Sequence, residues 1–182
     1  TGEMTWSKAK TTPEDLSQCV KEVFTLSGID PPHVAQLLHG QTLVVNTILQ
    51  RKGARVGLIT TKGFRDVLAL QRSNRRDIFN LQYRKPVPLV PRDRRLEVDE
   101  RTLADGRVLR EVDREALLCA YESLRARQVE SIAVCFINSY INPSNETRAL
   151  ELIRELQKTK DSNHVRYLSV SSDVSREWRE YE

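Results

Sequence analysis

A stretch between residues 34 and 61 changes its hydrophobic period twice, and this change limits the possible fold more than any other feature. Residues 34–38 are mostly apolar, as in a short buried strand, and residues 43–51 place apolar side chains at helical spacing. Residues 55–61 form a second apolar run, rich in β-branched side chains. A strand, a helix and a strand joined this closely indicate a right-handed parallel crossover, so the stretch predicts an α/β sheet.

The turn at residues 39–42, His-Gly-Gln-Thr, joins the first predicted strand to the helix. Gly40 permits a close backbone approach, and Thr42 suits the N-cap position. The free amides of the first helical turn would favour an anion or a carbonyl oxygen. Gly53 is expected to close the helix. Local features leave two interpretations open: an ordinary β–α connection or a ligand-binding turn.

The rest of the chain alternates predicted helices and strands. We expect a weak strand over residues 4–11 and a helix that begins with Thr12 as N-cap and Pro13 in its first position. Further predictions are a hairpin joining residues 95–101 to 107–110 through Asp105-Gly106, a helix capped by Asp113, a central strand at 131–138, a helix beginning at Asn142-Pro143, a strand at 165–170 and a new helix near residue 175.

No linker of low complexity divides the chain. We expect residues 1–93 to form an α/β core segment, and residues 94–182 to form a second α/β lobe with the start of the following helix. Residues 72–95 are rich in arginine and proline, which favours an extended surface segment. This segment is a solvated connection, an anion-binding rim or an RNA-facing patch. Its only aromatic residues are Phe79 and Tyr83, which argues against nucleic-acid binding.

The composition excludes several classes of protein. The 29 basic and 25 acidic residues give a net charge of +4, so the charges are nearly balanced and interleaved. Three widely spaced cysteines without a CxxC pair fit buried, reduced thiols, and therefore a cytoplasmic protein. The longest apolar run, residues 132–137, is far below the roughly 18 residues that a membrane span requires. No secretory signal is present in the sequence.

Most familiar catalytic motifs are absent from the sequence, including Walker A, GxGxxG, HExxH and GxSxG. The three histidines, at positions 33, 39 and 164, form no closely spaced set with the cysteines, so no metal site is expected. Asp99 and Glu100 are consecutive on a predicted strand and would point to opposite faces, which makes them a poor acid–base pair. No catalytic residue follows from these patterns.

Several separated motifs resemble those of one known family. They are HGQT at residues 39–42 followed by Asn46, RKGAR at 51–55, TTKGFRDV at 60–67, PLVPR at 88–92, AVC at 133–135, NP at 142–143 and REYE at 179–182. In order and spacing they resemble the N-terminal region of the hydantoinase/oxoprolinase family. That family includes N-methylhydantoinases, 5-oxoprolinases and ATP-binding subunits of acetone and acetophenone carboxylases. The resemblance implies an actin-like ATPase-type partial domain with a small inserted α/β lobe.

The resemblance also implies a chemistry. ATP, with Mg²⁺, would phosphorylate the oxygen of a carbonyl compound, after which water opens a cyclic amide such as hydantoin or 5-oxoproline. In the carboxylase branch an activated ketone would instead be carboxylated. The family's phosphate-binding loop is expected outside this chain, so the fragment alone is expected to be inactive. A second subunit of a hetero-oligomer is the expected partner.

The resemblance and the turn together select candidate residues that line a substrate or nucleotide site. These are His39, Gly40, Gln41, Thr42, Asn46, Arg72 and Asn74. Gln41 and Val45 stand where the family usually carries threonine, and this leaves the choice between hydrolase and carboxylase open. A third hypothesis, from another class, is a non-catalytic module that binds through the surface of residues 72–95.

Overall fold

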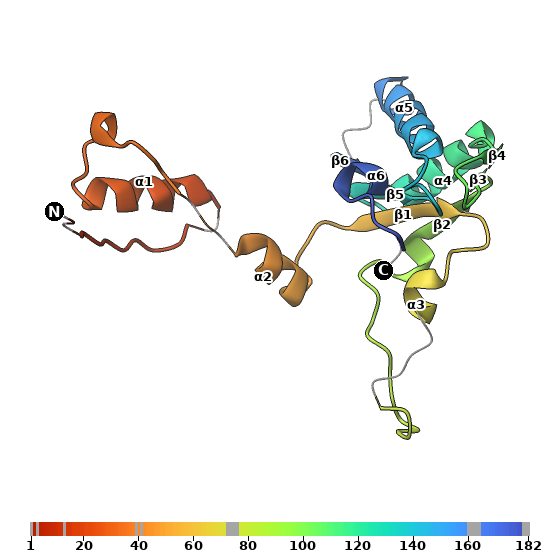
Figure 1. Ribbon diagram of the computed structural model, residues 1–182, viewed down its shortest axis with the longest axis horizontal. Coiled ribbons are helices and arrows are strands. Elements are labelled where there is room, and N and C mark those ends of the chain that lie inside the picture. Colours follow the sequence, from red (N-terminus) through yellow and green to blue (C-terminus); the bar gives the residue numbers. More distant parts are fainter. Residues whose placement is uncertain are drawn as a thin grey trace. The chain divides into compact units, whose positions relative to one another are not determined.

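The computed structural model describes residues 2, 4–12, 14–38, 40, 42–71, 77–159 and 165–179. The chain divides into two compact units. The N-terminal unit is Thr1–Asn46, and the sheet unit is Thr47–Glu182 (Figure 1).

The N-terminal unit contains α1 (Leu16–Leu26), the short 3-10 helix η1 (Pro31–His33) and the first half of α2 (Leu43–Gln50). The prediction that the first helix begins near Thr12 was wrong. Asp15 is the N-cap, because its carboxylate accepts a hydrogen bond from the Ser17 amide at 2.9 Å. The Thr12 hydroxyl instead donates to the Asp15 carbonyl, and Pro13 lies outside the described residues.

Two predicted strands of this unit do not form. Residues 4–11 and 34–38 have no regular secondary structure, and the side chains of Leu37 and Leu38 are exposed. A strand needs a neighbouring strand for its backbone groups, and in the described part of the chain no segment pairs with either stretch. The predicted strand–helix–strand crossover around α2 is therefore wrong.

The sheet unit contains a parallel sheet, as the apolar runs of the sequence predicted. Its four strands are β1 (Val56–Thr61), β2 (Arg95–Val98), β5 (Ser131–Cys135) and β6 (Tyr167–Val170), in the order β2-β1-β5-β6. All three pairings are parallel, so the carboxyl ends of the strands meet at one edge. The sheet also crosses the expected boundary after residue 93, since β1 lies before it and the other three strands after it.

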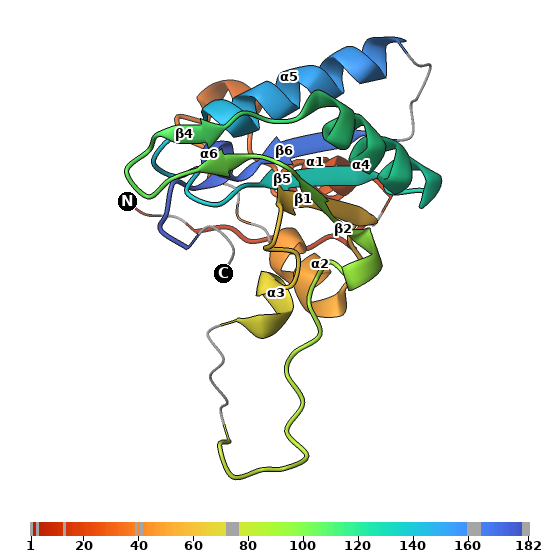
Figure 2. The ribbon, with the colours of Figure 1, turned by 90° about the vertical axis from the view of Figure 1, so that its right-hand side faces the viewer.

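Two helices, α4 (Arg114–Ala126) and α5 (Ser144–Thr159), lie on one face of this sheet (Figure 2). Asp113 caps α4 as predicted, because its carboxylate accepts from the Ala116 amide at 2.7 Å. The fully buried side chains of the helices and strands form one core, which includes Ile59, Leu117, Tyr121, Leu124, Ile132, Val134 and Ile153. Alternate residues of β5 face this core, as the period of a strand requires.

Gly57 in β1 lets α4 approach the sheet closely. A Cβ atom built at this position would lie 2.7 Å from Leu124 Cδ2, which is shorter than any relaxed contact. The absence of a side chain at residue 57 therefore sets the depth at which Leu124 packs.

The predicted hairpin is only partly correct. β3 (Arg101–Thr102) pairs antiparallel with β4 (Val108–Arg110), and Gly106 adopts a φ of 84° in the turn between them. The first half of the predicted strand, residues 95–98, forms β2 in the parallel sheet instead, because it pairs with β1. The described part of this unit also contains three short helices: α3 (Val67–Leu70), η2 (Arg92–Arg94) and α6 (Ser171–Val174).

Candidate functional site

The three candidate residues that the structure describes lie in the turn before α2 and in the first turn of that helix. The amide of Asn46 donates to the Thr42 carbonyl at 2.9 Å, which is the first turn of the predicted helix. The Asn46 side-chain amide also lies 3.3 Å from Thr42 Oγ1, and Gly40, Thr42 and Asn46 are all exposed. Thr42 and Asn46 thus present a hydroxyl and an amide side by side. The other four candidates, His39, Gln41, Arg72 and Asn74, lie outside the described residues.

The helix ends earlier than Gly53, the residue expected to close it. Arg51 adopts the left-handed conformation with a φ of 54°, and the Lys52 amide donates to the Thr47 carbonyl at 3.1 Å. This is the hydrogen-bond pattern of a left-handed helix terminus, formed here by arginine instead of glycine. The Arg51 side chain donates to the Val87 carbonyl at 2.6 Å, which fixes it in place.

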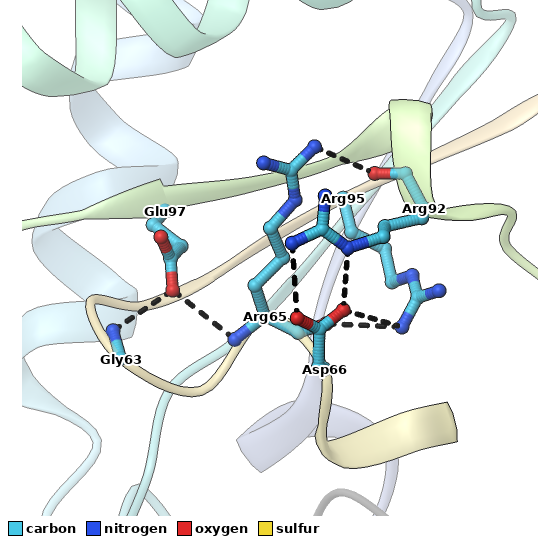
Figure 3. Close-up of polar contacts among 6 residues, drawn as sticks. All are labelled: Gly63, Arg65, Asp66, Arg92, Arg95 and Glu97. Atoms are coloured by element: carbon cyan, nitrogen blue, oxygen red, sulfur yellow. Dashed lines mark hydrogen bonds and ion pairs between the residues drawn. The ribbon is translucent and has the colours of Figure 1, made fainter. Parts of the chain in front are cut away.

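The carboxyl edge of the parallel sheet is the second place where a ligand is expected in an α/β fold. A tight turn, Lys62 to Asp66, follows β1 at this edge, with Gly63 at a φ of 91°. The carboxylate of Glu97 on β2 accepts hydrogen bonds from the amides of Gly63, at 2.8 Å, and of Arg65, at 3.2 Å (Figure 3). One carboxylate therefore ties the backbone of this turn, at Gly63 and Arg65, to β2.

Three arginines surround one carboxylate beside this turn (Figure 3). Arg92 makes two hydrogen bonds to Asp66, at 2.8 and 3.1 Å, and Arg95 approaches Asp66 at 3.9 Å. The Arg92 hydrogen bond is the largest cause of the lowered pKa of Asp66. Burial lowers the pKa of Arg95, whose Nη1 donates to the Arg65 carbonyl at 3.0 Å. The Nε atoms of Arg65 and Arg95 are buried and have no hydrogen-bond partner among the described residues. Three guanidinium groups act on the one carboxylate of Asp66, so this corner carries excess positive charge.

A buried polar network ties the strand ends together behind the turn. The Thr61 hydroxyl donates to Glu100, and the same oxygen accepts from the Ile137 amide at 3.0 Å. Asn145 Nδ2 donates to the other oxygen of Glu100 at 2.7 Å and to the Arg110 carbonyl at 3.0 Å. Burial is the largest cause of the raised pKa of Glu100, and the hydrogen bonds from Thr61 and Asn145 oppose it.

A second buried carboxylate, Glu146 at the start of α5, joins the ends of β5 and β6. It accepts hydrogen bonds from the Phe136 amide at 2.9 Å, the Ser171 hydroxyl at 2.7 Å and the Ser172 amide at 2.8 Å. The Ser171 hydroxyl also lies 3.1 Å from that of Ser139. Sequence reasoning missed this network because its members are far apart in the chain and no local pattern connects them.

A cavity of about 320 Å³ opens at the same edge, beside β5, β6 and α6. Its lining offers a thiol, several hydroxyls and two charged groups, from Cys135, Ser169, Ser171, Ser175, Glu177 and Arg179. The Arg179 guanidinium also stacks over the Trp178 ring at 4.3 Å. Such a lining can bind a small polar molecule through both donors and acceptors. All three cysteines are free thiols, but Cys119 is exposed and the other two are only partly buried, so the prediction that they are buried was wrong.

Neither a metal centre nor a membrane span is found in the part of the chain that the structure describes. No three His, Cys, Asp or Glu side chains there lie close enough to hold a metal ion. Among the described helices, none is both long and apolar enough to cross a bilayer.

Comparison with known proteins places the whole arrangement in a family. Residues 1–157 match the family described as the hydantoinase/oxoprolinase N-terminal region. The acetophenone carboxylase gamma subunit of Aromatoleum aromaticum is 32% identical over 96% of this chain and 26% of its own length. The 5-oxoprolinase of Saccharomyces cerevisiae is 34% identical over 81% of this chain and 13% of its own length.

Solved structures agree with the sequence relatives. An acetone carboxylase structure superposes with a TM-score of 0.80 at 26% identity, covering 94% of this chain and 26% of its own. The ATP-dependent caprolactamase of Pseudomonas jessenii superposes with a TM-score of 0.76 at 27% identity, covering 99% of this chain and 27% of its own. The chain thus spans about a quarter or less of the proteins that it matches. With its parallel sheet and these matches, the chain belongs to the hydantoinase/oxoprolinase family and corresponds to its N-terminal region.

Proposed function

We propose that this chain is the N-terminal part of an ATP-dependent enzyme that opens a cyclic amide, of the hydantoin or 5-oxoproline type, through a phosphorylated intermediate. The observation that carries the proposal is the match of nearly the whole chain to an ATP-dependent caprolactamase, a lactam-opening enzyme by its name. The identity with a 5-oxoprolinase supports the same substrate class. Since the chain spans about a quarter of the caprolactamase, the activity belongs to a longer polypeptide, and this part alone is expected to be inactive.

Within that enzyme, this chain would contribute positioned polar groups. Thr42 and Asn46, with His39, Gly40 and Gln41 before them, would line the substrate or nucleotide site through the hydroxyl and amide at the start of α2. Glu97 would keep the turn after β1 rigid, and a rigid turn positions a ligand without an ordering cost at the moment of binding.

ATP, when bound, supplies the phosphoryl group, and Mg²⁺ offsets its charge. Mg²⁺ beside a nucleotide is held mainly by phosphate oxygens, water and one or two carboxylates, and the described residues include no group of three ligands that would hold a metal ion without the nucleotide. The phosphate-binding loop is expected outside this chain.

A specific observation also favours a second candidate, a subunit of an ATP-dependent ketone carboxylase. The identity with the acetophenone carboxylase gamma subunit extends over 96% of this chain, and the acetone carboxylase structure gives the TM-score of 0.80. Both candidates share activation of a carbonyl oxygen by ATP and differ in what attacks next, water or a carboxylating species.

The two candidates are separated by measuring ADP release from the full-length enzyme. ADP release that depends on hydantoin, 5-oxoproline or caprolactam, with ring opening, supports the proposal. Consumption of acetone or acetophenone that depends on bicarbonate supports the second candidate. If neither occurs, and the protein instead binds RNA in a salt-dependent way, the chain is a binding module and both are wrong.

Arg72 and Asn74 are proposed to contribute to the same site, with Arg72 offsetting phosphate charge. In the full-length enzyme, Arg72→Ala should lower the rate of ATP turnover at least tenfold while leaving the melting temperature nearly unchanged. Arg84→Ala, an exposed arginine further along the same segment, is the matched control and should leave turnover unchanged. Equal rates for both variants would remove Arg72 from the site.

Two further parts of the proposal concern assembly and compartment. Two relatives are named as subunits, a carboxylase gamma subunit and a caprolactamase subunit alpha, which supports a hetero-oligomer for this protein too. Dependence on ATP and three free cysteines support a cytoplasmic enzyme.

A further inference from the structure

The cavity beside β5, β6 and α6 contains one hydroxyl that a buried carboxylate orients. Ser171, the first residue of α6, lines the cavity, and its Oγ donates to the carboxylate of Glu146 at 2.7 Å. Glu146 is fully buried and also accepts from the amides of Phe136 and Ser172, which hold it in place. The helix α6 lies against both strands (Figure 2). The hydrogen of the Ser171 hydroxyl therefore points at Glu146 and away from a ligand.

A hydroxyl has a single hydrogen, and this decides what Ser171 offers to a ligand. Because the hydrogen of Ser171 is used on Glu146, Ser139 is the donor of the 3.1 Å hydrogen bond between the two serine hydroxyls. The Ser171 oxygen accepts from Ser139 with one lone pair and keeps the other. Ser139 is 2% exposed and Ser171 is partly exposed, so of this pair Ser171 is the one open to the cavity. A ligand meets its oxygen with an N–H or O–H donor.

The rest of the described lining indicates a ligand without net charge. Its charged side chains are Glu177 and Arg179, which have opposite signs, and the Arg179 guanidinium has only hydrogen-bond donors. Apolar side chains also line the cavity, from Ala133, Val134, Val170 and Val174. The volume of about 320 Å³ is within the range of pockets for small molecules. An uncharged molecule with one donor, one acceptor and an apolar body matches these features.

We propose that this cavity binds an uncharged cyclic amide, with the amide N–H donating to Ser171 Oγ and the carbonyl oxygen facing Arg179. The inference rests on the proposed function and adds the place and the orientation in which the ring is bound. Caprolactam has the required groups, whereas 5-oxoproline carries an additional carboxylate. A ketone has the carbonyl oxygen but no N–H, so the cavity also favours an amide over the ketones of the second candidate.

The experiment compares two ligands of the full-length enzyme, caprolactam and N-methylcaprolactam, which has the same ring without the N–H. Dissociation constants are measured by calorimetry with a non-hydrolysable ATP analogue present, so that no turnover occurs. The wild type should bind caprolactam about tenfold more tightly or better, and in Ser171→Ala the preference should fall to about twofold or less. Partial unfolding weakens both ligands equally, so the ratio of the two constants reports the hydrogen bond and not stability.

Two control variants accompany Ser171→Ala. Ser171→Thr keeps the hydroxyl and should retain the preference for caprolactam. Ser131→Ala removes a hydroxyl at the amino end of β5, outside the cavity, and should leave both dissociation constants unchanged. The proposal is overturned if Ser171→Ala keeps the preference of the wild type, or if the wild type shows none.

Alkylation of the cysteines gives a second measurement on the unmodified sequence. Cys135 lines the cavity, whereas Cys119 is an exposed thiol on α4 and not part of the lining. Bound caprolactam should slow the reaction of Cys135 with iodoacetamide and leave that of Cys119 unchanged, measured by peptide mass spectrometry. A Cys135 rate that caprolactam does not change overturns the proposal, including the case in which the remainder of the enzyme covers the thiol.

Release of ADP distinguishes a failure of this proposal from a failure of the proposed function. If the enzyme opens a cyclic amide with ADP release but Ser171→Ala keeps the preference, the proposed function stands and the ring is bound elsewhere. If no cyclic amide causes ADP release and ketone is consumed with bicarbonate, the proposed function is wrong, and so is this assignment of the cavity.

Discussion

Thr61, the last residue of β1, donates its hydroxyl hydrogen to the carboxylate of Glu100, which lies two residues beyond β2. Both side chains are buried, and the Thr61 oxygen also accepts the Ile137 amide that follows β5. This single pair therefore connects the carboxyl ends of three neighbouring strands. It fixes the edge of the sheet from which the turn and the cavity arise.

Thr61→Val tests the pair, because valine keeps the shape of threonine and removes its hydroxyl. Glu100 then loses a donor and the buried Ile137 amide loses its acceptor, so the free energy of unfolding should fall by about 2 kcal/mol or more. Thr61→Ser keeps both hydrogen bonds and should cost less than half as much. Urea unfolding of the protein measures both variants, and equal losses would mean that the hydroxyl contributes nothing.

Glu100 predicts a pH dependence of stability. Burial raises the pKa of Glu100 above its ordinary value of 4.5, so the folded state holds more protons than the unfolded state between the two pKa values. The stabilisation that Glu100 contributes is therefore fully present below pH 4.5 and is lost as the pH rises through the folded-state pKa of Glu100. Glu100→Gln should remove this decline, which cannot exceed about 1.4 kcal/mol per pH unit for one group.

The neighbouring carboxylate provides a control of opposite sign. The Arg110 hydrogen bond lowers the pKa of Asp99, so this residue contributes stability above the ordinary value of 3.8 and loses it as the pH falls. Asp99→Asn should flatten the acid limb of the curve, whereas Glu100→Gln flattens the limb above pH 4.5. Unfolding curves recorded from pH 3 to 7 distinguish the two, and parallel curves for wild type and Glu100→Gln would contradict the assignment.

Gly57 tests the packing of α4 on the sheet. Gly57→Ala places a methyl group 2.7 Å from Leu124 Cδ2, and the overlap should lower the free energy of unfolding by about 1–3 kcal/mol. In a Leu124→Ala background the same substitution should cost much less, because the colliding atoms are gone. A double-mutant cycle in thermal or urea unfolding measures this coupling, and additive costs would show that the close approach is not what Gly57 provides.

Asn46 tests the proposed site at the start of α2. Its side chain is exposed and contacts only the Thr42 hydroxyl among the hydrogen bonds described, so Asn46→Ala should change stability by less than about 0.5 kcal/mol. In the full-length enzyme it should lower kcat/KM for the cyclic amide at least tenfold. Gln50→Ala, also exposed on α2, is the control, and a similar effect of both substitutions on turnover would argue against the site.

Local patterns in the sequence predicted the helices and strands that depend on residues only a few positions apart. Asp113 caps α4 because a carboxylate at that position reaches the amide of Ala116 within the same turn. The alternating and continuous apolar runs likewise predicted β1, β5 and β6 and the buried face of α4. The family and its expected fold followed from the order of the motifs, and the comparisons confirmed both.

Elements that need a distant partner were decided only by the tertiary structure. Residues 34–38 have the composition of a strand but pair with no described segment. Residues 95–98 were predicted to form part of a hairpin, but they pair with β1 in the parallel sheet. The same holds at the carboxyl edge, where Thr61, Glu100 and Asn145 come from three elements far apart in the chain. Helix caps and periods depend on residues a few positions away, which a sequence contains. Strand pairing and buried polar networks depend on which segments the folded backbone brings together, and only the tertiary structure supplies that.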